Sequence, residues 1–337
     1  MAVRGLSSGG DKFLPIKIAG SGRYLPGRIV PSSELEARCG LPPGWCERKQ
    51  GIKKRCWVED ETQSFMGAEA AKEAIADAGM ALTDIDLIFN ASQTFEQALP
   101  EGGTLILRRL GPGDCAIPCR TVTTGCLGFL TALYMSAALI KAGRYRNILI
   151  VTAEICSAAL DFNKPEVCTL LGDGAAAVVV TPTAAGEDSG IHAIRMETYS
   201  ESSSASSLAG INKRKTIFNQ DLQPQDLVFQ YNPKEMQAAG LKYNQKFIAR
   251  MWPEIKMDQV KLVIPNQASK LTFDYMRLLF PRKNLVCIID RYGNCGASGH
   301  PLALDEALKT GQLERGDRTL LIGMGNGFSL MGIVLTY

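Results

Sequence analysis

Residues 121–140 read TVTTGCLGFLTALYMSAALI, and this stretch places Cys126 between an extended run, Ile117–Thr124, and a long apolar helix, Leu127–Ala142. A thiol at a helix start meets unpaired backbone N–H groups and the positive end of the helix dipole, which both favour the thiolate. Gly125 and Gly128 carry no side chains, so an acyl group and the backbone can come close to the sulfur. The pattern therefore predicts a cysteine nucleophile, and the competing interpretation is a small buried core residue.

Composition excludes several classes of protein. The chain has 337 residues, of which 46% are hydrophobic, and a net charge of +3 without a long basic run, so we expect no nucleic-acid partner. No segment is long and apolar enough to span a membrane, and the N-terminal residues lack an apolar signal core, so we expect a cytoplasmic protein. Ten cysteines without a CxxC pair and two histidines predict reduced thiols and no metal site.

Strand and helix patterns alternate along the whole chain, which predicts an α/β fold whose sheets are covered by helices on both faces. The same βαβαβαββ order occurs twice, in residues 1–183 and 184–337, and Cys126 in the first half corresponds to Asn294 in the second. Residues 199–226 are rich in serine and read as a surface loop. The predicted strands are Ile16–Gly20, Leu87–Ala91, Asn147–Ala153, Leu262–Pro265, Leu285–Asp290, Thr319–Gly323 and Phe328–Thr336; the predicted helices are Ser64–Ala78, Gly103–Leu110, Leu127–Ala142, Gln237–Met251, Lys270–Leu279 and Pro301–Lys309.

Five motifs in this order resemble the condensing enzymes of the 3-oxoacyl-[acyl carrier protein] synthase III type. They are TVTTGCLGF (121–129), LLGDGAAAVVV (170–180), VIPNQAS (263–269), RYGNCGASGHPLALDEAL (291–308) and GMGNGFS (323–329). The resemblance implies a thiolase-like fold with two pseudo-symmetric halves, a five-layered αβαβα core and a homodimer. It also implies that Cys126 accepts an acyl group and passes it to a malonyl-type thioester that loses carbon dioxide.

Asn266 departs from the family pattern, which has a histidine at this place. In the family this histidine and an asparagine, matched here by Asn294, donate hydrogen bonds to the thioester oxygen that becomes the enolate. The carboxamide of Asn266 can donate a hydrogen bond but cannot exchange a proton near neutral pH. The substitution is open to three interpretations: a natural branch with altered chemistry, an engineered change that traps an acyl-enzyme, or a degenerate subunit.

The resemblance also assigns substrate-binding roles. Trp45 matches a tryptophan that stacks on the adenine of coenzyme A, and Lys49 falls where a cation meets its phosphates. Ala158 and Leu271 stand where basic residues are common in the family. The expected substrates are thioesters of coenzyme A or of acyl carrier protein phosphopantetheine, with no permanently bound cofactor.

Three further segments receive roles from the same resemblance. Asn326 and Phe328 lie in a segment that resembles the glycine-rich loop whose backbone N–H, with that of Cys126, forms the oxyanion hole, and we expect Phe328 to contact the substrate. Leu99 matches a segment that crosses the dimer interface and walls the partner's acyl pocket. His300 stands where the family usually has valine or isoleucine, and we expect it to pack under the site.

The leading hypothesis is an acyltransferase that forms a carbon–carbon bond by decarboxylative Claisen condensation, in a specialised lipid or polyketide-like pathway. Two alternatives stay open at this point. One is an acyltransferase that makes an ester or amide without decarboxylation, and the other is a non-catalytic partner of another synthase subunit.

Overall fold

Two five-stranded sheets form the framework of the fold in the computed structural model, which describes residues 13–111, 113, 115–208, 226–280 and 283–337. The strand order of the first sheet is β1-β7-β6-β4-β5, and that of the second is β12-β11-β13-β14-β8. The strands of the first sheet are β1 (Ile16–Tyr24), β4 (Leu87–Asn90), β5 (Cys119–Thr121), β6 (Ile148–Glu154) and β7 (Gly174–Pro182). Those of the second are β8 (Gly190–Thr198), β11 (Val260–Pro265), β12 (Asn284–Leu285), β13 (Arg318–Gly325) and β14 (Ser329–Thr336).

The two sheets have the same topology, as the repeated sequence pattern predicts. From β1 to β5, two antiparallel pairings are followed by two parallel ones. From β8 to β12 the order is again two antiparallel and then two parallel pairings. The predicted boundary between residues 183 and 184 falls in the connection between β7 and β8, and a division into two separate domains there stays a prediction.

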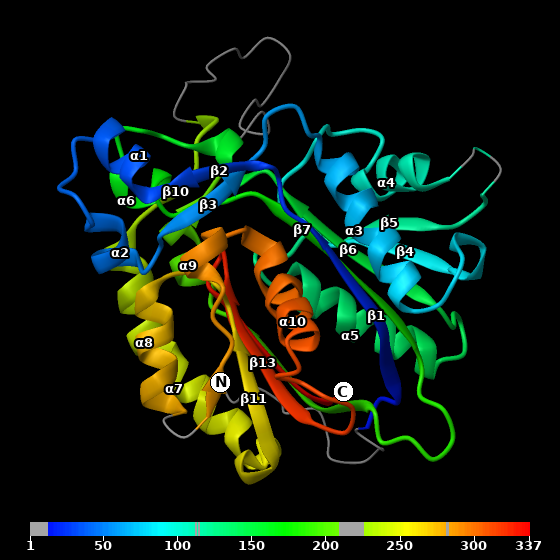
Figure 1. The fold of residues 1–337 in the computed structure, drawn as a ribbon. Helices are drawn as coiled ribbons and strands as arrows, with labels where there is room; N and C mark the ends of the chain where they lie inside the picture. The colour runs from blue at the N-terminus through cyan, green and yellow to red at the C-terminus, as the bar shows by residue number, and fades with distance from the viewer. Residues whose placement is uncertain (1–12, 112, 114, 209–225, 281–282) are drawn as a thin grey trace.

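Helices fill the space between the sheets and cover both outer faces (Figure 1). The central layer holds α5 (Gly128–Lys141) and α10 (Gly299–Lys309), whose apolar residues form one core with both sheets. Helices α3 (Gln63–Asp77) and α4 (Gly102–Leu110) cover the first sheet. Helices α7 (Pro233–Ile255) and α8 (Lys270–Leu279) lie over the second. The predicted five-layered αβαβα core is confirmed.

Smaller elements connect these strands and helices. They are β2 (Arg28–Pro31), α1 (Ser32–Arg38), α2 (Trp45–Gln50), β3 (Lys54–Trp57), α6 (Pro165–Cys168), β9 (Ser206–Ser207), β10 (Gln230–Tyr231) and α9 (Ile289–Tyr292), with 3-10 turns at Leu82–Asp84, Cys156–Ala159, Ser200–Ala205, Met257–Gln259 and Gly296–Ser298. The predicted surface loop at 199–226 thus contains a 3-10 turn and a short strand, and its residues 209–225 lie outside the described ones.

One predicted strand is wrong for most of its length. Residues 285–290 were expected to form a strand, whereas β12 ends at Leu285 and α9 begins at Ile289. The physical reason is a side chain from the neighbouring strand end: Gln267 accepts a hydrogen bond from the Ile288 N–H at 3.0 Å and donates to the Val286 carbonyl at 3.0 Å. These side-chain hydrogen bonds occupy backbone groups that would pair with the neighbouring strand if β12 were longer.

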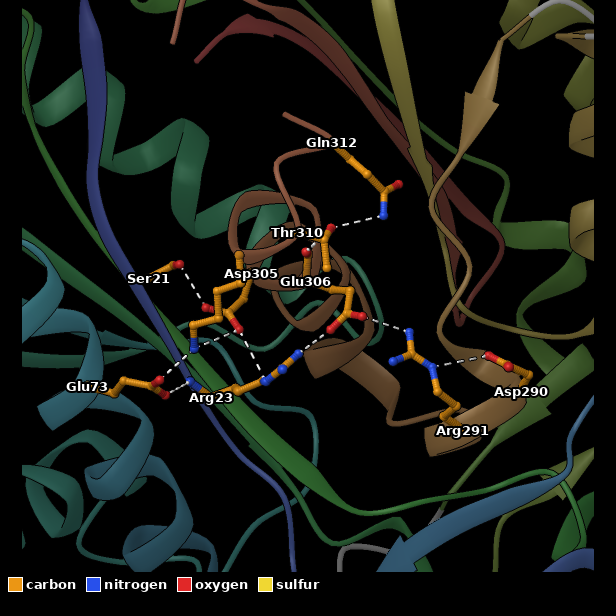
Figure 2. A network of polar contacts seen from close by, with 10 residues as sticks. Ser21, Arg23, Glu73, Asp290, Arg291, Asp305, Glu306, Thr310 and Gln312 are labelled. Carbon is orange, nitrogen blue, oxygen red and sulfur yellow. Dashed lines mark hydrogen bonds and ion pairs between the residues drawn. The ribbon is translucent and has the colours of Figure 1, made fainter. Parts of the chain in front are cut away.

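Charged side chains lock α10 to the layers around it (Figure 2). Glu306 pairs with Arg23 of β1 at 2.5 Å and with Arg291 of α9 at 2.9 Å. The buried Asp305 accepts a hydrogen bond from the Ser21 hydroxyl at 2.8 Å. Because these contacts fix the helix against β1 and α9, the position of its first turn beneath the second sheet's central strand is fixed as well.

Candidate active site

Cys126 lies in the short connection between β5 and α5, where two glycines allow other backbone segments to approach. A Cβ atom at Gly128 would lie 2.0 Å from the Ala91 carbonyl oxygen, so only glycine lets α5 start against the end of β4. Gly125 has a φ of +58°, and a Cβ there would lie 3.4 Å from the Asn326 backbone nitrogen. The glycines thus bring protein backbone close to Cys126. That they also leave room for an acyl group beside the sulfur stays a prediction.

The predicted thiolate is wrong for the free protein. Helix α5 begins at Gly128, one residue later than predicted, so Cys126 stands just before the N-cap residue Leu127. Burial, and after it the charge of Glu154, raises the pKa of the Cys126 thiol to about 12. Desolvation disfavours the charged form, and here it outweighs the helix start. The thiol is therefore protonated at neutral pH before a substrate arrives.

Two polar residues beside the thiol escaped the sequence analysis. The Cys126 Sγ donates to Oε1 of Gln93 at 3.6 Å. The backbone N–H groups of Gln93 and Thr94 donate to the carboxylate of Glu154, at 2.7 and 3.0 Å. Burial raises the pKa of the Glu154 carboxyl to about 7, although these hydrogen bonds oppose the rise. A signal existed in the sequence, since Glu154 is an acidic residue closing a strand of entirely buried residues.

Asn294 is held by both its backbone and its side chain. Its N–H donates to the Leu170 carbonyl at 2.9 Å, and its own carbonyl accepts from Gly172 at 3.0 Å. The carboxamide donates through Nδ2 to the Ala268 carbonyl at 3.3 Å and accepts from the Gly296 N–H at 3.0 Å. An amide nitrogen has two N–H bonds, so one remains for a ligand.

Asn266 follows β11 and is buried, with 3% of its surface exposed. Its Nδ2 donates to the Met324 carbonyl at 3.1 Å, which fixes the orientation of the amide because the reverse orientation would set oxygen against oxygen. Its Oδ1 has no hydrogen-bond partner among the described residues. Asn266 therefore offers one N–H and one unpaired acceptor beside a small apolar cavity of about 30 Å³ lined in part by Phe247 and Met276.

His300 lies next to Asn266 on the same face of β13. A Cβ at Gly323 would lie 2.6 Å from His300 Cε1 and 3.0 Å from Asn266 Cβ, so the two side chains flank one glycine. The Nε2 atom of His300 lies 3.2 Å from the Ile322 carbonyl, and Nδ1 has no partner in the described part of the chain. Burial lowers the pKa of this imidazole to about 4, although the backbones of Ile322 and Cys126 favour its protonation. It is neutral near neutral pH and packs under the site as expected.

The loop between β13 and β14 reaches the Cys126 segment through Asn326, as its contact with Gly125 shows. The Asn326 side chain accepts a hydrogen bond from the Ser206 hydroxyl at 3.1 Å. Phe328 is fully buried, has a φ of +46° and packs against Tyr199 and Tyr243. Its predicted contact with substrate stays a prediction, because the ring lies within the core of the free protein.

The residues predicted to bind the substrate carrier lie at the surface. Trp45 is half-buried at the first position of α2, and Lys49 is exposed in the last turn of the same helix. A Cβ at Gly51 would lie 3.3 Å from Lys270, so the start of α8 borders this rim. Leu99, in the connection between β4 and α4, has 84% of its surface exposed.

Within the described ranges, no group of three His, Cys, Asp or Glu residues could hold a metal ion. No helix in the same ranges has the length and apolar character needed to cross a bilayer.

Comparison with known proteins gives a consistent match along the chain. The family model of 3-oxoacyl-[acyl-carrier-protein (ACP)] synthase III matches residues 121–200, and its C-terminal model matches residues 253–337. The beta-ketoacyl-[acyl-carrier-protein] synthase III of Aquifex aeolicus is 32% identical over 95% of this chain and 99% of its own. The crystal structure of 3-oxoacyl-[acyl-carrier-protein] synthase III from the same organism has a TM-score of 0.83 at 28% identity, covering 96% of this chain and all of that one.

A second solved structure supports the fold. The priming beta-ketosynthase from the R1128 polyketide biosynthetic pathway has a TM-score of 0.87 at 22% identity and covers 96% of both chains.

Proposed function

The chain belongs to the 3-oxoacyl-[acyl-carrier-protein] synthase III family, and from this premise we propose that it is an acyltransferase that performs a decarboxylative Claisen condensation through Cys126. The observation that carries the proposal is the meeting of three segments: the Cys126 connection, the Asn326 loop and the Asn294 junction. A Cβ at Gly125 would lie 3.4 Å from the Asn326 backbone nitrogen, and a Cβ at Gly128 would lie 3.5 Å from Ala297, which follows Asn294 by three residues.

In the first step the sulfur of Cys126 loses its proton and attacks the carbonyl carbon of an acyl thioester. The carbonyl oxygen becomes negative and takes hydrogen bonds from backbone N–H groups of the Cys126 connection and the Asn326 loop. The carbon–sulfur bond to the carrier then breaks, and the carrier thiolate leaves and takes up a proton. Cys126 now carries the acyl group as a thioester.

In the second step a malonyl-type thioester loses carbon dioxide. The electrons of the broken carbon–carbon bond form an enolate. Its oxygen accepts hydrogen bonds from the side-chain N–H groups of Asn294 and Asn266 that have no partner in the described part of the free protein. The enolate carbon attacks the acyl carbon, and the tetrahedral intermediate collapses to the 3-oxoacyl product and the Cys126 thiolate. No base is required, because the departing carbon dioxide leaves the enolate behind.

This route suits the side chains at the site better than ester or amide formation does. Activation of a hydroxyl or amine acceptor calls for a general base with a pKa near the operating pH. Asn266 cannot act as a base, and the pKa of His300, lowered to about 4 by burial, leaves it a weak one. Glu154 has a pKa of about 7, but the backbone N–H groups of Gln93 and Thr94 occupy its oxygens. Asn266 as a donor fits a natural branch of the family whose enolate is held by two carboxamides.

Substrate carriage and assembly complete the proposal. Trp45 and Lys49 at the α2 rim offer an aromatic face and a cation to coenzyme A or to the phosphopantetheine of an acyl carrier protein. Leu99 is an exposed leucine on a loop, which a homodimer would cover by placing it against the partner's acyl pocket. Soluble thioesters serve as substrates, and no resident cofactor takes part.

Intact-protein mass spectrometry tests the proposal. The protein is incubated with acyl thioesters of coenzyme A and of acyl carrier protein, with Cys126→Ala as the control, and is then chased with a malonyl thioester. We expect a mass gain that requires Cys126 and disappears with release of carbon dioxide. A gain that persists through the chase would point to a trapped acyl-enzyme or to another acceptor, and no gain from any donor would favour a non-catalytic partner subunit.

A further inference from the structure

Glu154 is a buried carboxyl that no cation neutralises within the described ranges. Glu154 is the last residue of β6 and is fully buried. It forms no ion pair with a Lys, Arg or His among the described residues. Its two oxygens accept the backbone N–H groups of Gln93 and Thr94 instead. Burying an unpaired charge is costly, whereas N–H donors favour the anion. These opposing effects leave the carboxyl able to change its charge near neutral pH, and its pKa is about 7.

The turn that Glu154 holds is the one that presents Gln93 to the nucleophile. The Gln93 Oε1 accepts the Cys126 S–H at 3.6 Å. Its Nε2 lies against Gly296, where a Cβ would come within 2.4 Å of that nitrogen. The amide is thus enclosed between the thiol and the Gly296 segment, whose N–H binds Asn294. The hydrogen bond to Oε1 favours the protonated thiol, because a thiolate has no proton to donate.

The other titratable groups around Glu154 do not compensate its charge. Cys126 faces it from the connection before α5, Cys156 from the 3-10 turn after β6, and Cys295 from the turn before α10. Burial raises the pKa of Cys156 and of Cys295 well above the usual thiol value, so both stay neutral. Asp173, at the start of β7, acts on these two thiols and adds a negative charge to the region. Cys126 is therefore the group at the reaction centre that responds to Glu154.

We propose that Glu154 and Gln93 form a positioning pair that controls when Cys126 becomes nucleophilic. Ionised Glu154 disfavours the thiolate and leaves the sulfur hydrogen-bonded to Gln93, and neutral Glu154 lowers the cost of ionising the sulfur. The effect is electrostatic and geometric, and neither residue forms a bond to the substrate. The proposal deepens the function proposed above by naming what regulates its nucleophile.

Alkylation of Cys126 by iodoacetamide provides the test, because it reads the thiolate without any acyl substrate. Peptide-level mass spectrometry follows modification of Cys126 alone in the full chain, from about pH 5 to about pH 9, a range that covers the ionisation of Glu154. The variants are Glu154→Gln, a neutral mimic of the protonated carboxyl, and Glu154→Asp, which keeps the charge. We expect about tenfold faster alkylation in Glu154→Gln near pH 8, which corresponds to a thiol pKa lower by one unit.

The sign of the change separates this role from a structural one. If Glu154 only supported the turn, Glu154→Gln and Glu154→Asp would both react more slowly than the wild type or at its rate, and that result would overturn the proposal. The wild type gives a second test should Glu154→Gln fail to fold. Its rate should rise by less than tenfold per pH unit around pH 7, since ionisation of Glu154 opposes that of Cys126.

A constant tenfold rise in the wild type through about pH 7 would also refute the coupling, because an isolated thiol follows that slope below its pKa. The outcome is independent of the condensation assay. A chain that alkylates as expected but never accepts an acyl group would retain the Glu154–Gln93 pair and lose the proposed reaction.

Discussion

Changing Asn266 to histidine tests whether His300 occupies the space that an imidazole at position 266 needs. Both residues bind the Ile322 carbonyl, Asn266 through its backbone N–H at 2.9 Å and His300 through Nε2 at 3.2 Å. Both side chains also approach Gly323, where an added Cβ would lie 2.6 Å from His300 Cε1 and 3.0 Å from Asn266 Cβ. The neighbouring cavity of about 30 Å³ is too small to accept a displaced ring. We therefore expect Asn266→His to destabilise the fold by about 1–3 kcal/mol, the usual cost of overpacking a core.

Removing the second ring should restore the space. His300→Val loses the hydrogen bond to Ile322, which we expect to cost about 1 kcal/mol, but it also removes an unpaired buried Nδ1. In the double variant Asn266→His/His300→Val, the new ring can occupy the vacated volume. We expect the double variant to be more stable than the sum of the two single changes by about 1–2 kcal/mol, as for residues that share one packing site.

Urea unfolding followed by circular dichroism supplies the four stabilities of this cycle, at a pH near 7 where His300 is neutral. Asn266→Gln/His300→Val serves as a control that keeps a carboxamide at position 266 and adds no ring. The reasoning would be refuted if the stability changes of the two single variants added up to that of the double variant within about 0.5 kcal/mol, as is expected of separate sites. Acyl-enzyme formation by each variant shows whether Cys126 stays reactive through the series.

Three other perturbations have defined outcomes. Gly128→Ala would place a methyl group 2.0 Å from the Ala91 carbonyl oxygen, and we expect the free energy of unfolding in urea to fall by more than about 2 kcal/mol. Gly143→Ala, at an exposed helix end with open space around it, serves as a comparison that measures the backbone cost alone. Glu154 has its pKa raised from 4.5 to about 7 in the fold, so stability should fall by about 3 kcal/mol as pH rises from 4.5 to 7; Glu154→Gln should flatten that part of the stability curve, and an unchanged slope would assign it to other groups. The Sγ atoms of Cys39 and Cys168 lie 3.5 Å apart, so mild oxidation by a disulfide such as oxidised glutathione should cross-link them, seen as one linked peptide pair that Cys39→Ser abolishes.

Features set by short sequence patterns were predicted correctly. The alternation of strands and helices, the doubled order of elements and the placing of Cys126 before α5 follow from hydrophobic period and from glycine positions, which act over a few residues. The fold class was reached in this way, whereas the family and the reaction type came from the resemblance of five motifs to a known family. The predicted edge strand at 285–290 failed because Gln267, about twenty residues earlier in the chain, takes its backbone hydrogen bonds.

The tertiary structure alone decided the charge and orientation of the site. Gln93 and Glu154 are separated from Cys126 by 33 and 28 positions in the sequence, and only the pairing of β4 with β6 brings them to one place. A pKa depends on dehydration and on neighbouring charges, which are properties of the assembled site. The sequence by itself therefore predicted that Cys126 is the nucleophile, which stays a prediction, whereas packing raises the pKa of its thiol beside a buried carboxyl.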